Sequence, residues 1–170
     1  MDLGIAGRVA AVAAGSSGLG LGSARALMAE GCRVVICGRD RERLDAAVAT
    51  LRSGADPSDV GSVDGVVADV GPPEGAEGVV DAVVERAGAP VGILGGYAGG
   101  PPPGDFESTD VSASPAALDL NLLSIVAMCK AAVPGRRQRG WGRVVAITSL
   151  SVRQPIPNLI LSNTARAGAT

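Results

Sequence analysis

Three glycines near the N-terminus have the spacing of a phosphate-binding turn. The segment reads Ala14-Gly15-Ser16-Ser17-Gly18-Leu19-Gly20 and lies between a short apolar run and a helical pattern. Glycine lets the backbone turn tightly and bring its N–H groups against a phosphate, and the N-terminus of a helix adds a favourable dipole. A glycine triplet alone is weak evidence, but its place between a predicted strand and helix predicts a dinucleotide-binding turn. A merely flexible turn is the alternative interpretation.

Charged residues follow the next apolar run, where dinucleotide-binding folds recognise the adenosine ribose. The sequence there is Gly38-Arg39-Asp40-Arg41. Arg39 can pair with a 2′-phosphate, which favours NADP(H), whereas an acid such as Asp40 would bind the free 2′-hydroxyl of NAD(H). We predict NADP(H), with NAD(H) as the alternative. A third interpretation is a solvated charge run that caps the following helix.

Five apolar runs alternate with helical patterns and must position these residues. The predicted strands cover residues 8–14, 33–37, 63–68, 91–95 and 143–148, with a Gly/Ser/Asp/Pro-rich loop before the third. The predicted helices cover residues 19–30, 41–51, 76–87 and 114–137, and another begins near residue 158. This alternation implies right-handed crossovers and a Rossmann-type, doubly wound parallel sheet in three α/β/α layers, with strand order 3-2-1-4-5. Without an internal repeat or linker, residues 1–170 are predicted to form a single domain.

The longest predicted helix, residues 114–137, is apolar nearly all round. Ser114 is its predicted N-cap, with Pro115 in the first turn. A helix on the face of a sheet normally keeps one polar side, so the pattern needs an explanation. Deep burial within one chain and a subunit interface are the two interpretations, and we favour the interface.

Composition excludes several classes of function. Lys and Arg number 15 against 17 Asp and Glu, a net charge of −2, so no basic surface for nucleic acid or an anionic membrane is expected. The chain has no histidine, which excludes Ser-His-Asp hydrolysis and HExxH zinc sites. Its three cysteines lack metal-ligand spacing, so no metal is predicted. No targeting segment or membrane helix is recognised, which predicts a cytoplasmic protein with neither nucleic-acid nor membrane partner.

On these residues the chain resembles the short-chain dehydrogenase/reductase family, and within it the 3-oxoacyl-acyl-carrier-protein reductase-like proteins. The family motif TGxxxGxG matches Ala14–Gly20 with only the leading Thr changed, and Asp69 matches the acid that contacts the adenine ring. The resemblance implies an NADP(H) cofactor. The implied binding residues are Gly15, Ser17, Gly18, Leu19, Gly20, Arg39, Asp69, Val70, Ala98, Gly99 and Arg166.

The same resemblance assigns a reaction centre. Asn121 matches the active-site asparagine of the long helix, and Ser149 matches the serine that orients the substrate oxygen. Where the family has YxxxK, this chain reads SNTAR, so Ser162 replaces the tyrosine acid and Arg166 replaces the lysine that binds ribose. We predict these four residues as catalytic. A serine hydroxyl is far less acidic than a phenol with a pKa near 10, so turnover is expected to be slow.

Two functions from different classes follow from the resemblance. The first is an NADP(H)-dependent oxidoreductase that interconverts the carbonyl and alcohol forms of a small molecule. The second is a dinucleotide-binding protein without turnover, or a truncated remnant of the family. Because family members continue past the position of Thr170 with two more strands, the resemblance implies an incomplete domain with an open edge at the fifth strand. It also implies a homo-oligomer, a dimer or tetramer.

Overall fold

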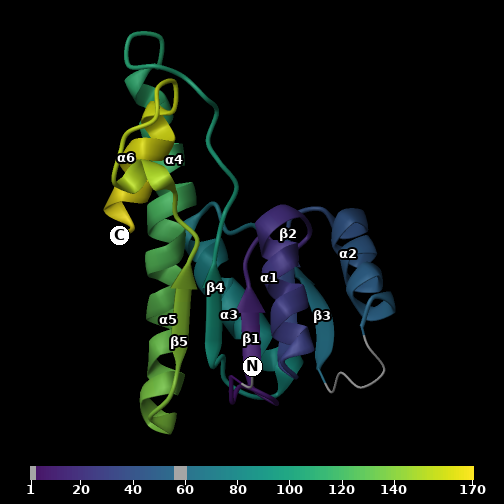
Figure 1. Cartoon of the computed structure of the whole chain (residues 1–170). Coiled ribbons are helices and arrows are strands. Elements are labelled where there is room, and N and C mark those ends of the chain that lie inside the picture. The colour runs from purple at the N-terminus through teal and green to yellow at the C-terminus, as the bar shows by residue number, and fades with distance from the viewer. Residues whose placement is uncertain (1–2, 56–60) are drawn as a thin grey trace.

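Five parallel strands rich in Val, Ile, Leu and Ala form the centre of the structure, a computed structural model that describes residues 3–55 and 61–170 (Figure 1). They are β1 (Val9–Val12), β2 (Arg33–Gly38), β3 (Ser62–Val67), β4 (Ile93–Gly96) and β5 (Arg143–Ala146). Their order is β3-β2-β1-β4-β5, and every neighbouring pair is parallel. All four residues of β1 are buried, as expected for a central strand covered on both faces. The predicted fold class and strand order are confirmed.

Helices cover both faces of this sheet. They are α1 (Gly18–Ala29), α2 (Arg41–Ser53), α3 (Pro73–Ala87), α4 (Ser114–Leu118), α5 (Ser124–Arg139) and α6 (Ile160–Gly168). On one face α1 and α2 bury a cluster that includes Ile36 and Leu44, and on the other α3 and α5 bury Leu94 and Met128. Burying one such side chain contributes about 1.5–3 kcal/mol. Helix α6 packs against α4 beyond the carboxyl ends of the strands (Figure 1).

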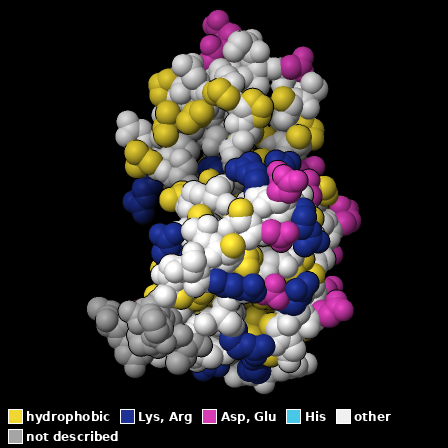
Figure 2. Space-filling model, turned by 90° about the vertical axis from the view of Figure 1, so that its right-hand side faces the viewer, with side chains coloured by type: hydrophobic (Ala, Val, Ile, Leu, Met, Phe, Trp, Pro, Cys, Tyr) yellow, Lys and Arg dark blue, Asp and Glu magenta, His cyan; other side chains and the backbone are white. Residues whose placement is uncertain are grey.

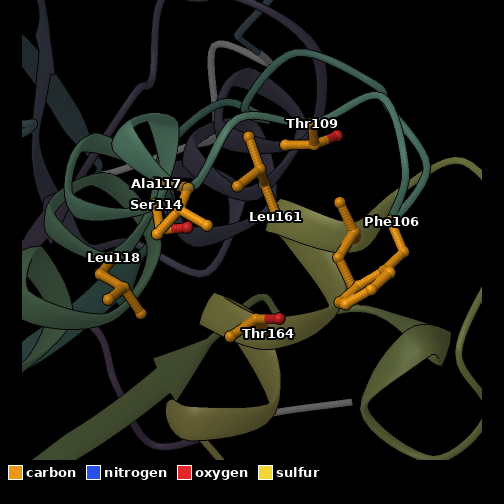
Figure 3. A pocket seen from close by; sticks show the side chains of 9 residues that line it. Phe106, Thr109, Ser114, Ala117, Leu118, Leu161 and Thr164 are labelled. Carbon is orange, nitrogen blue, oxygen red and sulfur yellow. The ribbon is translucent and has the colours of Figure 1, made fainter.

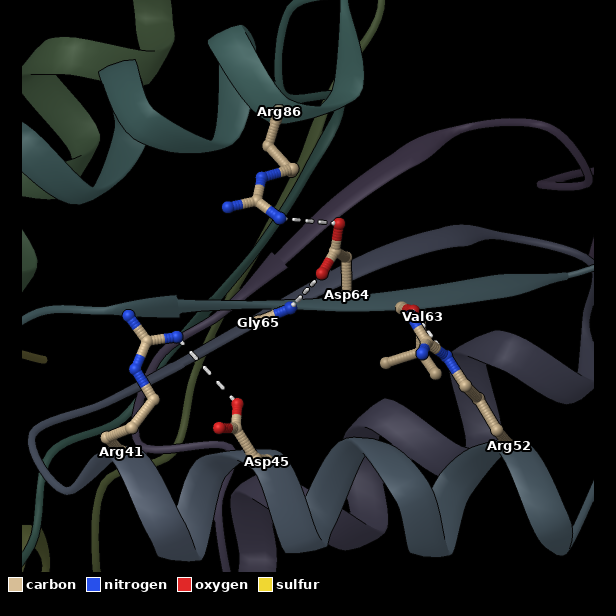
Figure 4. A network of polar contacts seen from close by, with 7 residues as sticks. All are labelled: Arg41, Asp45, Arg52, Val63, Asp64, Gly65 and Arg86. Atoms are coloured by element: carbon tan, nitrogen blue, oxygen red, sulfur yellow. Dashed lines mark hydrogen bonds and ion pairs between the residues drawn. The ribbon is translucent and has the colours of Figure 1, made fainter.

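Polar contacts join α2, β3 and α3 at the outer edge of the sheet (Figure 4). Arg86 donates to Asp64 Oδ2 at 3.0 Å, and Asp64 Oδ1 accepts the Gly65 N–H at 2.8 Å. Arg52 Nη2 donates to the Val63 carbonyl at 2.9 Å. Partial burial raises the pKa of Asp64, but the hydrogen bonds from Gly65 and Arg86 outweigh it, so the net shift is downward. The carboxylate therefore stabilises this edge near neutral pH, and its contribution is lost as pH falls through the lowered pKa.

The long helix differs from its prediction at its start and in its middle. It consists of a 3-10 turn (Val111–Ala113), α4, a π-turn (Asp119–Leu123) and α5. Its N-cap is Asp110, whose carboxylate accepts a backbone N–H of the first turn at 2.8 Å, so the prediction of Ser114 as N-cap is wrong. Pro115 has no N–H to bond the carbonyl four residues earlier, and the first turn closes instead with the tighter Ser114 N–H to Val111 C=O bond.

Only one side of this long helix is buried within the chain. Ala127, Met128 and Ala132 are buried in the cluster shared with α3, whereas Leu123 and Val126 are 41% and 45% exposed. Deep burial within one chain therefore accounts for only part of its apolar surface. By length and composition alone, Val111–Arg139 could also cross a membrane. The absence of a membrane partner and the cytoplasmic location stay predictions.

Strand β5 lies at the edge of the sheet and pairs only with β4 among the described residues. Its Val144 and Val145 are 46% and 58% exposed, which confirms the predicted open edge. The loop predicted before β3 falls partly on residues 56–60, outside the described residues.

Gly20 allows α1 to lie against the end of β1, and its replacement tests this close approach. A Cβ at Gly20 would lie 2.3 Å from the Ala14 carbonyl oxygen, a backbone atom with little freedom to move. We expect Gly20→Ala to lower the free energy of unfolding by about 2–3 kcal/mol. Gly22 in the same helix is exposed with open space around an added Cβ, so Gly22→Ala should raise it by about 0.5–1 kcal/mol. Urea denaturation measures both, and shifts of the same sign would contradict this role of Gly20.

Candidate functional site

A cleft of about 460 Å³ opens at the carboxyl edge of the sheet. The loops after β1, β2, β3 and β4 meet there, because parallel strands end at one edge. The edge between β1 and β4 is where the helices change faces, the place where such sheets bind ligands. Six of the predicted cofactor residues line the cleft: Ser17, Arg39, Asp69, Val70, Ala98 and Gly99.

The glycine turn after β1 lines this cleft with Ala14, Ser16 and Ser17, while the Gly15 N–H donates to the Cys37 carbonyl at 2.9 Å. Ala14 and Gly18 have positive φ angles of 48° and 54°. An added Cβ at Gly18 meets no atom within 4 Å, so the backbone conformation, not crowding, favours glycine there. At Gly15 the added Cβ would instead lie 2.6 Å from Ile36 Cβ. Ser17 is the N-cap of α1 but makes no side-chain capping bond, which leaves the N–H groups of the first turn available to an anion.

Arg39 and Asp40, at the end of β2, have different tasks. Asp40 Oδ1 accepts the Arg43 N–H at 3.0 Å and caps α2. The Arg39 side chain is 75% exposed, and its Nη1 lies 3.9 Å from Asp69 Oδ2. Asp69 is oriented by its Oδ1, which accepts the Gly71 N–H at 2.9 Å. The capping interpretation therefore holds for Asp40, while Arg39 makes only a long, exposed ion pair with Asp69 and can still reach a phosphate in the cleft.

Several side chains in the cleft were not among the predicted site residues. Arg43 adds a second cation to the lining of the cleft, and Tyr97 adds an aromatic ring. The sequence contains a signal for each of them. Arg43 lies three residues after Asp40, the spacing of a helix N-cap and the N–H that it accepts, and Tyr97 is the only tyrosine of the chain. Cys37 also lines the cleft, but burial raises the pKa of its thiol to about 11, so it stays protonated. Residues 3–55 and 61–170 contain no cluster of three or more His, Cys, Asp or Glu side chains placed to hold a metal ion.

The Arg166 side chain ties the exits of β4 and β5 to α6. Its Nε donates to Ser162 Oγ at 3.2 Å. Its Nη1 donates to the carbonyls of Ile147 and Thr148 at 3.1 and 3.3 Å, and its Nη2 to those of Ala98 and Gly99 at 3.4 and 3.1 Å. A guanidinium has five N–H donors, so each of them has an acceptor within the chain.

This hydrogen bonding changes what Arg166 can do at the site. The side chain is buried, and burial lowers the pKa of Arg166, but an arginine keeps its charge in proteins. Its guanidinium also lies 5.9 Å from the centre of the Tyr97 ring. The predicted hydrogen bond to a cofactor ribose would require Arg166 to give up one of its present acceptors. In this structure Arg166 therefore supports the wall of the cleft through its hydrogen bonds to Ala98 and Gly99.

Two serine hydroxyls near this support keep a hydrogen to donate. Ser162 Oγ accepts from Arg166 Nε, and Ser149 Oγ accepts the Ser151 N–H at 3.1 Å. Ser149 directly follows Thr148, one of the carbonyls that Arg166 binds. Both oxygens therefore use a lone pair within the protein and leave their own O–H for another acceptor.

Asn121 lies in the π-turn of the long helix and is 2% exposed. Neither its amide nitrogen nor its amide oxygen has a hydrogen-bond partner among the described residues. Buried amides almost always have partners, so a water molecule or a polar ligand group is the natural complement here. The preceding residue, Leu120, lines the cleft, and π-turns of this kind occur often at functional sites.

Comparison with known proteins gives consistent matches over most of the chain. The family profile described as short chain dehydrogenase matches residues 8–170. Dehydrogenase/reductase SDR family member 4 from Sus scrofa is 34% identical over 166 residues, which are 96% of this chain and 58% of that protein. The chain thus spans about three fifths of the length of this relative.

Solved structures resemble the chain equally well. L-sorbose reductase from Gluconobacter frateurii, complexed with NADPH and L-sorbose, superposes with a TM-score of 0.89 at 30% identity, over 99% of this chain and 62% of that one. An NADPH-bound short chain oxidoreductase from Pseudomonas aeruginosa PAO1, described as containing an atypical catalytic center, gives 0.83 at 32% identity, over 95% and 61%.

Replacing Arg166 separates a supporting role from direct ribose binding. Arg166→Met leaves four carbonyls without their donor, and we expect it to lower the free energy of unfolding by about 2–4 kcal/mol. Because Ala98 and Gly99 line the cleft, affinity for NADPH and for adenosine 2′,5′-bisphosphate should fall by similar factors. Denaturation and calorimetric titration measure these effects, with Arg153→Met, an exposed arginine in the loop after β5, as control. Weaker NADPH binding with unchanged stability and unchanged bisphosphate affinity would instead identify Arg166 as a ribose ligand.

Proposed function

Because the chain belongs to the short-chain dehydrogenase/reductase family, we propose that it is an NADP(H)-dependent oxidoreductase that interconverts a carbonyl and an alcohol. The observation that carries the proposal is the cleft at the carboxyl edge, where the glycine turn, Arg39 and Asp69 meet. The finer prediction of a 3-oxoacyl-acyl-carrier-protein reductase-like substrate stays part of this proposal. Fold alone does not identify the substrate.

The residues around the cleft fit a dinucleotide phosphate. The uncapped first turn of α1 supplies N–H donors for the pyrophosphate, and Gly18 leaves space beside it. Arg39, with Arg43 nearby, supplies the positive charge for a 2′-phosphate. When bound, the cofactor supplies or accepts a hydride.

The chain's own contribution to the reaction is the handling of a proton at the substrate oxygen. In our proposal the free O–H of Ser149 orients that oxygen, and the O–H of Ser162 donates to it while Arg166 holds Ser162 in place. Asn121 offers an amide that can hold a water molecule close by. A serine is a weak acid for this task, and loss of a well-matched acid costs about 10²–10⁴ in rate.

A single-turnover experiment tests the proposed activity. The chain is saturated with NADPH and mixed with a panel of ketones, and the loss of dihydronicotinamide absorbance is followed. We expect slow oxidation, which Ser149→Ala abolishes without weakening NADPH binding. Gly18→Val serves as the control that removes binding itself, since a β-branched residue is strained at its positive φ.

Titration of the chain with NADPH and with NADH tests which cofactor it binds more tightly. If Arg39 holds the 2′-phosphate, NADPH should bind at least tenfold more tightly than NADH, a difference of about 1.4 kcal/mol. Arg39→Ala should erase the difference, whereas Arg41→Ala, which loses only an exposed ion pair with Asp45 on α2, should keep it. Equal affinities in the unmutated chain would favour NAD(H).

A dinucleotide-binding protein without turnover is the second candidate. The specific observation in its favour is that Ser162 and Arg166, which replace the family's tyrosine and lysine, bind each other. Tight NADPH binding with no oxidation of any ketone would support this candidate. Failure to bind either dinucleotide would contradict both functions.

We further propose that the exposed apolar side of α5 is covered by a second copy of the chain, as a dimer or tetramer. Leu123, the last residue of the π-turn, and Val126, in the first turn of α5, are 41% and 45% exposed, and neighbouring exposed apolar side chains favour an interface. We expect sedimentation velocity at tens of micromolar to show an oligomer that Val126→Lys dissociates. A monodisperse monomer would contradict this assembly.

A further inference from the structure

A second cavity lies apart from the cofactor cleft, between the loop after β4, helix α4 and helix α6 (Figure 3). Its volume is about 140 Å³. Side chains from all three segments converge on it, with Phe106 from the loop, Leu118 from α4 and Leu161 from α6 (Figure 3). None of its lining residues was predicted to have a function.

The walls of this cavity are held in place by backbone contacts. The Gly104 N–H donates to the Asn158 carbonyl at 2.8 Å, and the Ile160 N–H donates to the Gly104 carbonyl at 3.1 Å. These two bonds join the loop to the start of α6 as a short parallel bridge. Asp105 closes the loop by accepting the Ser108 N–H at 2.7 Å. The cavity is therefore preformed, which lowers the entropic cost of binding a ligand.

The cavity faces away from the proposed reaction centre. An α-helix has 3.6 residues per turn, so residues four apart share a face and residues two apart lie on opposite faces. Ile160 and Thr164 line the cavity from α6, whereas Ser162 and Arg166 point to the other side of the same helix. Helix α6 therefore separates the two sites.

The polar groups in the cavity suit a neutral ligand. Hydroxyls of Thr109, Ser114 and Thr164 come from three segments, and in the described chain no hydrogen bond engages their oxygens. No cation lines the cavity, and the nearest charged groups along the loop are acids such as Asp105 and Asp110. Figure 2 shows hydrophobic and acidic side chains, without Lys or Arg, over this end of the visible face. An anionic ligand is disfavoured there.

Size narrows the class of ligand further. The cavity is open to solvent beside Phe106 and Val111, and its volume of about 140 Å³ is close to that of a cavity that holds benzene, so it accommodates one six-membered ring or a short branched chain. We propose that this cavity is a binding site for a small, uncharged, mainly apolar molecule with one hydroxyl or carbonyl group. The apolar walls hold its carbon skeleton, and one of the hydroxyls that line the cavity hydrogen-bonds its oxygen. This site is independent of the cofactor cleft.

Amide NMR shifts of the full chain, titrated with cyclohexanol, test the proposal. We expect saturable shifts confined to residues 104–118 and 158–168. Methylcyclohexane, which lacks the oxygen, should bind about three- to tenfold more weakly, and cyclohexanecarboxylate should not bind. Gly18→Val should leave cyclohexanol binding unchanged. The proposed ligand site can therefore be confirmed even if the proposed cofactor function is wrong.

Two variants fill the cavity and one matched variant does not. Ala117→Met places a larger side chain inside it, and Thr164→Leu does so from an exposed position where folding is not at risk. Both should weaken cyclohexanol binding at least tenfold. Ala167→Met, on the same helix but outside the cavity, should bind normally. Absence of saturable shifts, shifts confined to the cofactor cleft, or unchanged affinity in Thr164→Leu would overturn the proposal.

Discussion

A buried charge needs hydrogen bonds for all its donors, and at Arg166 this requirement determines how three segments of the chain meet. Its guanidinium binds carbonyls at the ends of β4 and β5 while its own helix supplies Ser162. The cleft wall at Ala98 and Gly99, the position of Ser149 and the placement of α6 therefore depend on one side chain. Removing this side chain would leave several carbonyls without their donor at once, each at a cost in free energy.

The three aromatic residues lie at contacts with charge or solvent, outside the two aliphatic clusters that form the core. Trp141 packs at the edge of one cluster, between Arg8 and Arg143, whose guanidinium carbons lie 4.2 and 5.0 Å from its ring centre. Tyr97 lies beside Arg166, and Phe106 is 84% exposed at the rim of the second cavity. Small aliphatic side chains suffice where helices and strands approach closely. The large rings remain for the places where a cation or an apolar ligand needs a flat surface.

The sheet could be predicted from sequence because apolar runs mark strands buried on both faces. The observed ends of the elements differ from the predicted ones where local backbone geometry determines them. The first strand ends at Val12 because Ala14 takes a left-handed conformation. The start of the long helix was misplaced because its cap, Asp110, precedes a 3-10 turn that carries no helical periodicity. The cleft residues next to strand ends were predictable, since topology alone brings such ends together. The hydrogen-bond partners of Arg166 could not be predicted, because the carbonyl groups that it binds lie between 18 and 68 residues away in the sequence.

Ser162 and Arg166 stand where the resembled family has tyrosine and lysine, and the loss of the tyrosine phenol is consistent with both replacements. In the resembled family the lysine binds the ribose and also lowers the pKa of the tyrosine phenol. Without the phenol, the second of these roles is lost. An arginine at that position can hydrogen-bond to the protein through its N–H groups and remain charged despite burial. A lysine buried there would tend to lose its proton. The exchange thus preserves a positive charge behind the cleft and strengthens the wall that Ala98 and Gly99 form. Relative to the resembled family, what this chain lacks is acid strength at residue 162, whereas the positive charge at residue 166 is kept.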